Sequence, residues 1–213
     1  MPILDEKVTK EVKKRLADLP HPVKIINFTQ ELECQFCKET RELLEDVAAL
    51  SDKITLEKYD LVKDQEAAKK FNIDKIPAAI VMGEKDYGIR FFGIPSGYEF
   101  STLLEAILMV SRRDSGLAEE TRQKLAGLKQ NLHLQVFITP TCPYCPGAVH
   151  LAHQFAMESD KVTADMVEAI EFPHLSQEFN VRGVPKTIAN QRDAAEGALP
   201  EAQLLARVLA IAQ

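Results

Sequence analysis

The sequence predicts an α/β protein made of two tandem copies of one unit, and three observations support this prediction. All four cysteines fall in two Cys-x-x-Cys motifs, Cys34-Gln-Phe-Cys37 and Cys142-Pro-Tyr-Cys145, whose first members are 108 residues apart. The segment FNIDKIP at residues 71–77 has a counterpart at the same offset, FNVRGVP at 179–185. Apolar patterns then predict the same order of strands and helices in both halves. We expect two domains, residues 1–115 and 116–213, each with a central mixed sheet flanked by helices.

In the first unit, the elements follow from where the apolar residues fall. An opening helix at 4–19 leads to a buried strand at 23–29. The helix at 34–50 places Leu43, Leu44, Val47 and Ala48 on one face. The remaining elements are a strand at 54–59, a short helix, a hairpin formed by 78–82 and 87–92, and a closing helix at 98–112.

The second unit repeats this order after a short linker at 114–116. Its expected elements are a helix at 118–130, a strand at 132–138, the second motif helix at 142–157, a strand at 162–170, short segments at 173–179, 187–189 and 194–197, and a last helix at 201–210. Because the linker is short and both flanking helices have apolar faces, we expect the two domains to pack as one rigid body.

The spacing inside each motif favours redox chemistry. Two cysteines three positions apart at a helix start can form a disulfide, and the leading thiol faces the unpaired N–H groups and positive end of the helix. This environment moves the thiol pKa from about 8.5 toward 7 or below, and the thiolate is the attacking species. The second cysteine resolves the mixed disulfide that the first one forms. The predicted catalytic residues are therefore Cys34, Cys37, Cys142 and Cys145.

Composition indicates a cytoplasmic redox protein and argues against several other classes. The charged first 19 residues contain no apolar signal core, and no run is long enough to span a bilayer. The net charge of −6 is divided evenly, because residues 1–115 carry 18 basic and 21 acidic side chains and residues 116–213 carry 8 and 11. We therefore expect neither a nucleic-acid nor a membrane partner.

These motifs carry a family resemblance over essentially the whole chain. A strand, a Cys-x-x-Cys helix, a second strand, a helix, an Ile-Pro or Val-Pro before a hairpin, and a closing helix resemble the thioredoxin fold, present here twice. Cys142-Pro-Tyr-Cys145 is similar to the glutaredoxin active-site motif, and the tandem arrangement resembles the glutaredoxin-like protein disulfide oxidoreductases. The amino-terminal part of the flavoprotein alkyl hydroperoxide reductases is similar too, but keeps one active dithiol. The resemblance implies reversible dithiol–disulfide exchange on protein substrates, without fixing its direction.

Two prolines gain a role from this resemblance. Pro77 and Pro185 each lie 43 residues after the first cysteine of their unit. Alone, either would be interpreted as a turn proline, since only about 5% of X-Pro bonds are cis. In the family the matching proline is cis and lies against the disulfide, and the preceding residue offers its backbone to a substrate strand. The substrate-binding residues that the resemblance implies are Ile76, Pro77, Val184 and Pro185, together with the motif aromatics Phe36 and Tyr144.

The two motifs differ in their neighbours. Glu31 and Glu33 flank Cys34 and disfavour its thiolate, although Lys38 offsets this, whereas Thr139-Pro140-Thr141 precedes Cys142. We therefore expect Cys142 to be the more acidic thiol. In the second motif Pro143 suits a helix start, but Pro146 would loosen the first turn, depending on which residue caps the helix.

The route of the proton during resolution is less defined. Some thioredoxins place a buried acid six residues before the first cysteine, and here Phe28 and Val136 occupy those positions. Proton transfer must therefore differ from that in those thioredoxins or use Glu39, Glu45 or water, and the sequence does not choose among these routes.

Other interpretations of the cysteines and histidines are weaker. Zinc ribbons place their cysteine pairs about 15–20 residues apart, whereas 104 residues separate these two pairs. Purely structural disulfides would not require Pro-Tyr between the cysteines or a matching downstream proline. His150 and His153 have a spacing that could hold a metal, but without neighbouring carboxylates we expect a solvated helix face. Phe91, Phe92 and Phe100 are expected in the core. We predict no metal and no organic cofactor, because the cysteines themselves hold the electrons.

Three functions from different classes fit these features. The first is a protein disulfide oxidoreductase that reduces, forms or isomerises disulfides of client proteins. The second is an electron carrier between an NADPH-dependent, thioredoxin-reductase-like flavoprotein and a peroxiredoxin. The third is a client-binding chaperone module that does not need its thiols. Glutathione would suit the glutaredoxin-like second motif, but protein partners fit the two-domain layout better.

Overall fold

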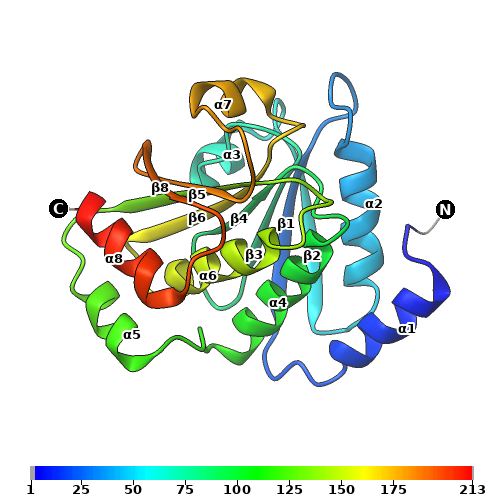
Figure 1. Ribbon diagram of the computed structural model, residues 1–213. Coiled ribbons are helices and arrows are strands. Elements are labelled where there is room, and N and C mark those ends of the chain that lie inside the picture. The colour runs from blue at the N-terminus through cyan, green and yellow to red at the C-terminus, as the bar shows by residue number, and fades with distance from the viewer. Residues whose placement is uncertain (1–2, 213) are drawn as a thin grey trace.

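The computed structural model describes residues 3–212 and shows one eight-stranded mixed sheet with helices on both faces (Figure 1). The strand order is β2-β1-β3-β4-β6-β5-β7-β8. The first four strands in this order come from the first half of the chain, and the other four repeat their arrangement. The predicted α/β class and the repeated unit are therefore confirmed.

The expected helices and strands are present, mostly with ends shifted by a few residues. The first half contains α1 (Glu6–Arg15), β1 (Val23–Thr29), α2 (Cys37–Ala48), β2 (Ile54–Asp60), α3 (Gln65–Phe71), β3 (Ala78–Met82), β4 (Ile89–Phe92) and α4 (Glu99–Arg112). The second half contains α5 (Glu119–Ala126), β5 (Leu132–Ile138), α6 (Cys145–Glu158), β6 (Val162–Glu168), α7 (Pro173–Glu178), β7 (Lys186–Ala189), β8 (Arg192–Glu196) and α8 (Glu201–Ile211). Within residues 3–212, no helix combines the length and apolar character needed to cross a membrane.

The two motif helices begin later than predicted. Phe36 and Tyr144 are the N-cap residues, so α2 starts at Cys37 and α6 at Cys145. The predicted starts at residues 34 and 142 were therefore wrong by three positions. In the second motif, the N–H of Cys142 donates to the carbonyl of Thr139 at 3.1 Å, which forms a turn ahead of the helix. Apolar periodicity marks the buried face of a helix but not the turn that leads into it.

Strands β4 and β6 join the two halves of the sheet. They pair in parallel, with Ile89 opposite Ala164 and Phe92 opposite Val167. All four of these residues are buried, so the pairing removes two strand edges from water. The sequence predicted a sheet in each unit, and the structure adds that the two sheets are continuous.

Apolar side chains from alternating strand positions form a core on each face of the sheet. Ile25 and Val136 belong to the core that α2, α4, α6 and α8 cover, whereas their neighbours Ile26 and Phe137 belong to the core beneath α3 and α7. Figure 1 shows α3 and α7 together above the sheet and α4, α6 and α8 below it. This alternation is what a sheet covered on both faces requires. Phe91 and Phe92 are buried as predicted, and Phe100 is half-buried against the first of these cores.

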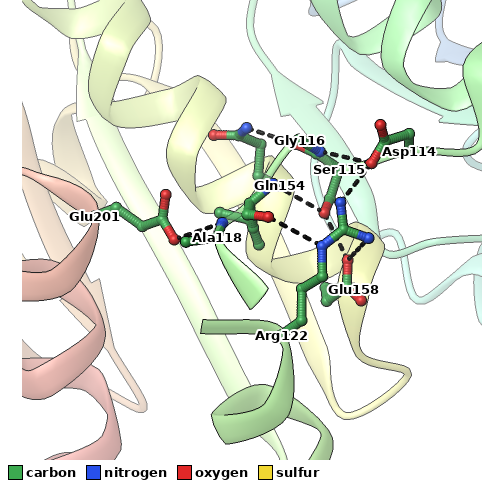
Figure 2. Close-up of polar contacts among 9 residues, drawn as sticks. Asp114, Ser115, Gly116, Ala118, Arg122, Gln154, Glu158 and Glu201 are labelled. Carbon is green, nitrogen blue, oxygen red and sulfur yellow. Dashed lines mark hydrogen bonds and ion pairs between the residues drawn. The ribbon is translucent and has the colours of Figure 1, made fainter. Parts of the chain in front are cut away.

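The linker between the halves is held by side chains from three helices (Figure 2). Gln154 of α6 donates to the carbonyl of Ser115 at 2.6 Å, and the Ser115 hydroxyl donates to Glu158 at 2.5 Å. Arg122 of α5 binds Asp114 at 2.5 Å, and Glu201 of α8 accepts the Ala118 N–H at 3.1 Å. These contacts and the continuous sheet fit the expected packing of the two halves as one rigid body. A domain boundary between residues 115 and 116 stays a prediction.

Candidate redox site

Strand directions bring both motifs to one edge of the sheet. Strands β1, β2, β4, β5 and β6 run the same way, because β1 pairs in parallel with β2, β6 pairs in parallel with β4 and β5, and β3 connects β1 to β4 through two antiparallel pairings. Each motif follows the carboxyl end of its strand, β1 or β5. Strands β3 and β7 run the opposite way, so Pro77 and Pro185, which precede them, lie at this edge as well. We call it the motif edge.

The first motif contains a disulfide between Cys34 and Cys37, with 5.5 Å between their Cα atoms. Cys37 is 1% exposed beneath the helix start, and Cys34 is half-buried in the preceding turn. The acidic neighbours Glu31 and Glu33 are exposed. Lys38 was expected to offset the charge of these glutamates, but its Nζ lies 3.9 Å from Oε1 of Glu42, one turn further along α2. The leading sulfur is therefore the one that a partner can reach.

The second motif has the same Cα–Cα distance, 5.5 Å, between Cys142 and Cys145, but it is more enclosed. Cys142 is 8% exposed and Cys145 is fully buried. The Cys142 Sγ lies 3.8 Å from the carbonyl oxygen of Val184. Pro146 occupies the second helical position, where no intrahelical acceptor exists for a backbone N–H, so the expected loosening of this turn has no basis.

The residues predicted to bind substrate lie at the motif edge. The Ile76-Pro77 and Val184-Pro185 peptide bonds are both cis, as the resemblance implied. Ile76, Val184 and Phe36 are half-buried, whereas Tyr144 is 72% exposed. Their role in substrate binding stays a prediction.

The sequence analysis missed a buried carboxyl at the start of α4, the helix whose N-cap contacts the segment before the second motif. Glu99, the first residue of α4, is fully buried; its Oε2 accepts from the Thr102 hydroxyl at 2.7 Å, and its Oε1 has no partner. Burial raises the pKa of Glu99 to about 7, although the Thr102 hydrogen bond opposes this. The preceding residue, Tyr98, donates its N–H to the carbonyl of Pro140 at 2.9 Å, two residues before Cys142. A carboxyl at the start of an otherwise inward-facing apolar helix was the signal that could have found it.

Two further carboxyls lie at the carboxyl end of β6 and just beyond it, at the middle of the motif edge. Glu168 accepts the N–H of Glu171 at 2.6 Å, and Glu171 accepts the N–H of Ile94 at 2.7 Å. Burial raises the pKa of both carboxyls, and that of Glu171 reaches about 7. At Glu171 the charges of Glu168 and Glu39 act in the same direction as burial, and together these effects outweigh the hydrogen bond from Ile94. Of the predicted proton carriers, Glu39 is exposed and Glu45 forms an ion pair with Lys58 at 2.7 Å. Glu99 and Glu171 therefore join them as candidates.

The expected solvated face at His150 and His153 was wrong. His153 is 1% exposed, packs edge-on against Phe91 with ring centroids 4.8 Å apart, and has its Nε2 3.2 Å from the Arg90 carbonyl. Burial lowers the pKa of His153 to about 3, and burial also lowers that of His150. The cause is that α6 packs against α4 and the sheet, so it has little free surface. Among residues 3–212, no three His, Cys, Asp or Glu side chains converge to hold a metal.

A polar cleft of about 350 Å³ lies away from the motif edge, where the two halves meet on the α3 and α7 face. Its Arg90 guanidinium donates to both oxygens of Asp86, and the His133 Nε2 lies 2.5 Å from Asp165. Burial disfavours the charged imidazole, but the hydrogen bond and charge of Asp165 raise the pKa of His133. Because these charged groups already pair with one another, the cleft offers little to a ligand.

Comparison with known proteins gives matches over both halves of the chain. A family model described as thioredoxin domain matches residues 132–210. The structure of a protein disulfide oxidoreductase from Aeropyrum pernix is similar with a TM-score of 0.93 and 31% identity, over 99% of this chain and 95% of that one. A structure of the alkyl hydroperoxide reductase AhpF from Enterococcus faecalis is similar with a TM-score of 0.86 and 27% identity, over 96% and 99%. The alkyl hydroperoxide reductase of the same type from Staphylococcus aureus is 26% identical over 171 residues, 80% of this chain and 31% of that protein. The chain spans about a third of the length of the curated relatives that it matches.

Proposed function

This chain belongs to the tandem thioredoxin-fold, glutaredoxin-like protein disulfide oxidoreductases, and we propose that it reduces, forms or isomerises disulfides of client proteins at two sites. Thiol–disulfide oxidoreductase is the class that its two Cys-x-x-Cys pairs and its relatives support. The observation that carries the proposal is the pair of disulfides at one sheet edge, each with a buried second cysteine. The leading cysteine is accessible in the first motif, and in the second it lies beside the Val184 carbonyl.

The chemistry at each site proceeds in two balanced steps. The thiolate of Cys34 or Cys142 attacks one sulfur of a client disulfide, forming a mixed disulfide while the other client sulfur leaves as a thiolate. Cys37 or Cys145 then loses its proton and attacks the leading sulfur, which closes the protein disulfide and releases the second client thiolate. The client gains two electrons and the site loses two. Disulfide formation is the same sequence in reverse.

The burial of Cys37 and Cys145 sets the order of attack. Only the leading sulfur can meet a bulky client, whereas the second sulfur can reach its partner three residues away. The resolving thiol must give up a proton in a place with little water. A carboxyl whose pKa lies near 7, such as Glu99, would accept that proton at neutral pH.

The second candidate function is electron transfer between a flavoprotein reductase and a peroxiredoxin. It is supported by the likeness to AhpF and to the Staphylococcus aureus relative, whose names assign those proteins to the reduction of alkyl hydroperoxides. In this case one dithiol would receive electrons from an NADPH-dependent flavoprotein and pass them to the peroxidase. Both functions use the same exchange chemistry and differ in the partner.

We assign the protein to a reducing compartment such as the cytoplasm, and this assignment is part of the proposal. Its support is the use of the cysteines. All four lie in short-range pairs at a sheet edge and none closes a long loop, which is the pattern of catalytic rather than stapling disulfides.

The proposal is tested by reduction of insulin disulfides with dithiothreitol as electron donor. We expect the wild-type chain to accelerate the reaction and the double variant Cys34→Ser/Cys142→Ser to be inactive. The double variant is also assayed for protection of an unfolding client against aggregation. If the double variant protects the client fully and the wild-type chain shows no reductase activity, the chaperone function is favoured instead. Equilibration with glutathione buffers of known potential then gives the favoured direction at each site, since about 30 mV corresponds to about 1.4 kcal/mol.

A further inference from the structure

Five exposed, large apolar side chains follow the carboxyl ends of the five parallel strands, one in each loop. We call them the apolar rim; in the order β2, β1, β4, β6 and β5 they are Val62, Leu32, Tyr98, Ile170 and Tyr144. Their exposed fractions run from 53% for Tyr98 to 76% for Leu32. Within residues 3–212, the one other large apolar side chain in this exposed class is Ile3, ahead of α1. Isolated apolar residues are normal on a surface, but their confinement to one edge marks a contact site.

From this placement we propose that the apolar rim docks an extended segment of a client protein across both dithiols at once. The inference rests on the proposed function and specifies its substrate: an unfolded or loop segment with apolar and basic side chains. Thiol–disulfide exchange requires direct contact between sulfurs, so any client must lie on the motif edge. Between the two motifs, the rim runs along this edge from Leu32, two residues before Cys34, to Tyr144, between Cys142 and Cys145.

The dimensions fit one extended chain. Three strands, β3, β4 and β6, separate β1 from β5. At about 4.8 Å per strand the two motifs lie about 19 Å apart, and an extended chain that rises about 3.3 Å per residue covers this distance with about six residues. Tyr98 and Ile170 stand on the loops after β4 and β6, between the motifs, where the middle of such a segment would pass.

A second copy of this chain is a poorer occupant than a client. A stable dimer buries about 800 Å² on each partner through about 20–30 residues, whereas the rim contributes one side chain per loop. The exposed carboxylates of Glu31, Glu33 and Glu39 lie beside the rim at the first motif. Two copies that met through their first motifs would bring like charges together, whereas a segment with basic residues would complement these charges.

Bivalent capture tests the span directly. The variant Cys37→Ser/Cys145→Ser keeps both leading thiols and cannot resolve mixed disulfides. It is mixed with a peptide whose two cysteines are each activated as a disulfide with thionitrobenzoate. Each capture forms one bond between Sγ of Cys34 or Cys142 and a peptide sulfur, and releases one thionitrobenzoate. Mass spectrometry and the released absorbance give peptides bound and leaving groups released per protein.

We expect the outcome to depend on spacing. With six or more residues between the peptide cysteines, one peptide should be bound and two leaving groups released for each protein. With two intervening residues, two peptides should be bound to each protein. Two bound peptides at every spacing would overturn the bridging arrangement. The matched control adds Cys34→Ser to the variant, and should bind one peptide with release of one leaving group at all spacings.

A second experiment tests the rim residues. The kcat/KM for insulin is divided by that for hydroxyethyl disulfide, a small substrate that reports on the chemistry alone. In Ile170→Asn this ratio should fall about fivefold, since one apolar contact contributes about 1 kcal/mol. Ile3→Asn, the same change at an exposed site elsewhere, should leave the ratio as in the wild type.

The outcomes separate this inference from the proposed function. Wild-type protein that reduces neither substrate contradicts the proposed function. Activity on both, with an unchanged ratio in Ile170→Asn, overturns the rim as a docking surface and leaves the proposed function standing. A wild-type dimer in sedimentation that Ile170→Asn converts to a monomer would show that a second copy covers the rim, which also overturns the inference.

Discussion

The two motifs share their local geometry and differ in their surroundings. Each closes a disulfide with Cα atoms 5.5 Å apart, each has its helix starting at the second cysteine, and each half has a cis proline at the motif edge. Cys34, however, is half-buried next to two exposed glutamates, whereas Cys142 is 8% exposed and touches the Val184 carbonyl. The fold therefore sets the pairing of the sulfurs, and the loop residues set how readily each leading thiolate forms and what can approach it.

The largest expected difference is between the two leading cysteines. Cys142→Ser should lower insulin reduction about tenfold, whereas Cys34→Ser should leave more than about half of it. The reason is that Glu31 and Glu33 disfavour the Cys34 thiolate, and one pKa unit corresponds to about 1.4 kcal/mol or tenfold in thiolate population. Steady-state rates of both variants under the same donor measure this.

Two results would change this comparison. Equal loss from both variants would show that electrons pass obligatorily from one site to the other. A larger loss from Cys34→Ser would mean that enclosure of Cys142 outweighs the acidic neighbours of Cys34, and that the ranking of the sites is wrong.

Removal of the resolving thiol should trap the client at the more active site. In Cys145→Ser the mixed disulfide between Cys142 and a client cannot be resolved, so most of the protein should run as a covalent adduct on a non-reducing gel. Cys37→Ser is the matched variant at the other site and should give several-fold less adduct. Similar amounts from both would show that the two leading thiols attack equally well.

Glu99 should make the stability of the protein pH-dependent. Its folded pKa of about 7 lies above the ordinary value of 4.5, so the folded state binds the proton more tightly than the unfolded state. The contribution is present below pH 4.5 and is lost as pH rises to 7, on the order of 3 kcal/mol at most. Glu99→Gln should remove this part of the decline, measured as unfolding free energy in urea between pH 5 and 8. Glu178→Gln, at an exposed position, should retain the wild-type profile; a wild-type profile in Glu99→Gln would contradict the assignment.

The smallest effect is expected at Pro146. Because Pro146 occupies the second helical position, its missing N–H costs no hydrogen bond. Pro146→Ala should therefore lower the unfolding free energy by less than about 1 kcal/mol, and only because the unfolded chain gains conformational entropy. Chemical denaturation of the variant tests this. A clear gain in stability would show that the proline does strain the start of α6.

The sequence was sufficient for the repeat, the element order and the four cysteines, because these follow from spacing and periodicity. It was not sufficient where the answer depended on contacts between distant segments. His153 has polar chemistry and helical spacing like a surface residue, and only the packing of α6 on α4 and the sheet buries it. Glu99 and Glu171 lie 43 and 29 residues from Cys142, so their positions at the motif edge emerge only from the topology. The pairing of β4 with β6 was hidden for the same reason, since either strand could have been an edge.

That pairing means that the repeated unit is not a detachable module, although the sequence repeats as if it were. If the chain were cut between residues 115 and 116 and the halves separated, β4 would become an edge strand. Its four residues, Ile89–Phe92, are buried in the intact protein and would present an open row of backbone N–H and C=O groups. Its counterpart β6 would be uncovered in the same way. A mostly apolar strand edge of this kind recruits other strands, so isolated halves would self-associate. Thus each redox unit protects the other from aggregation.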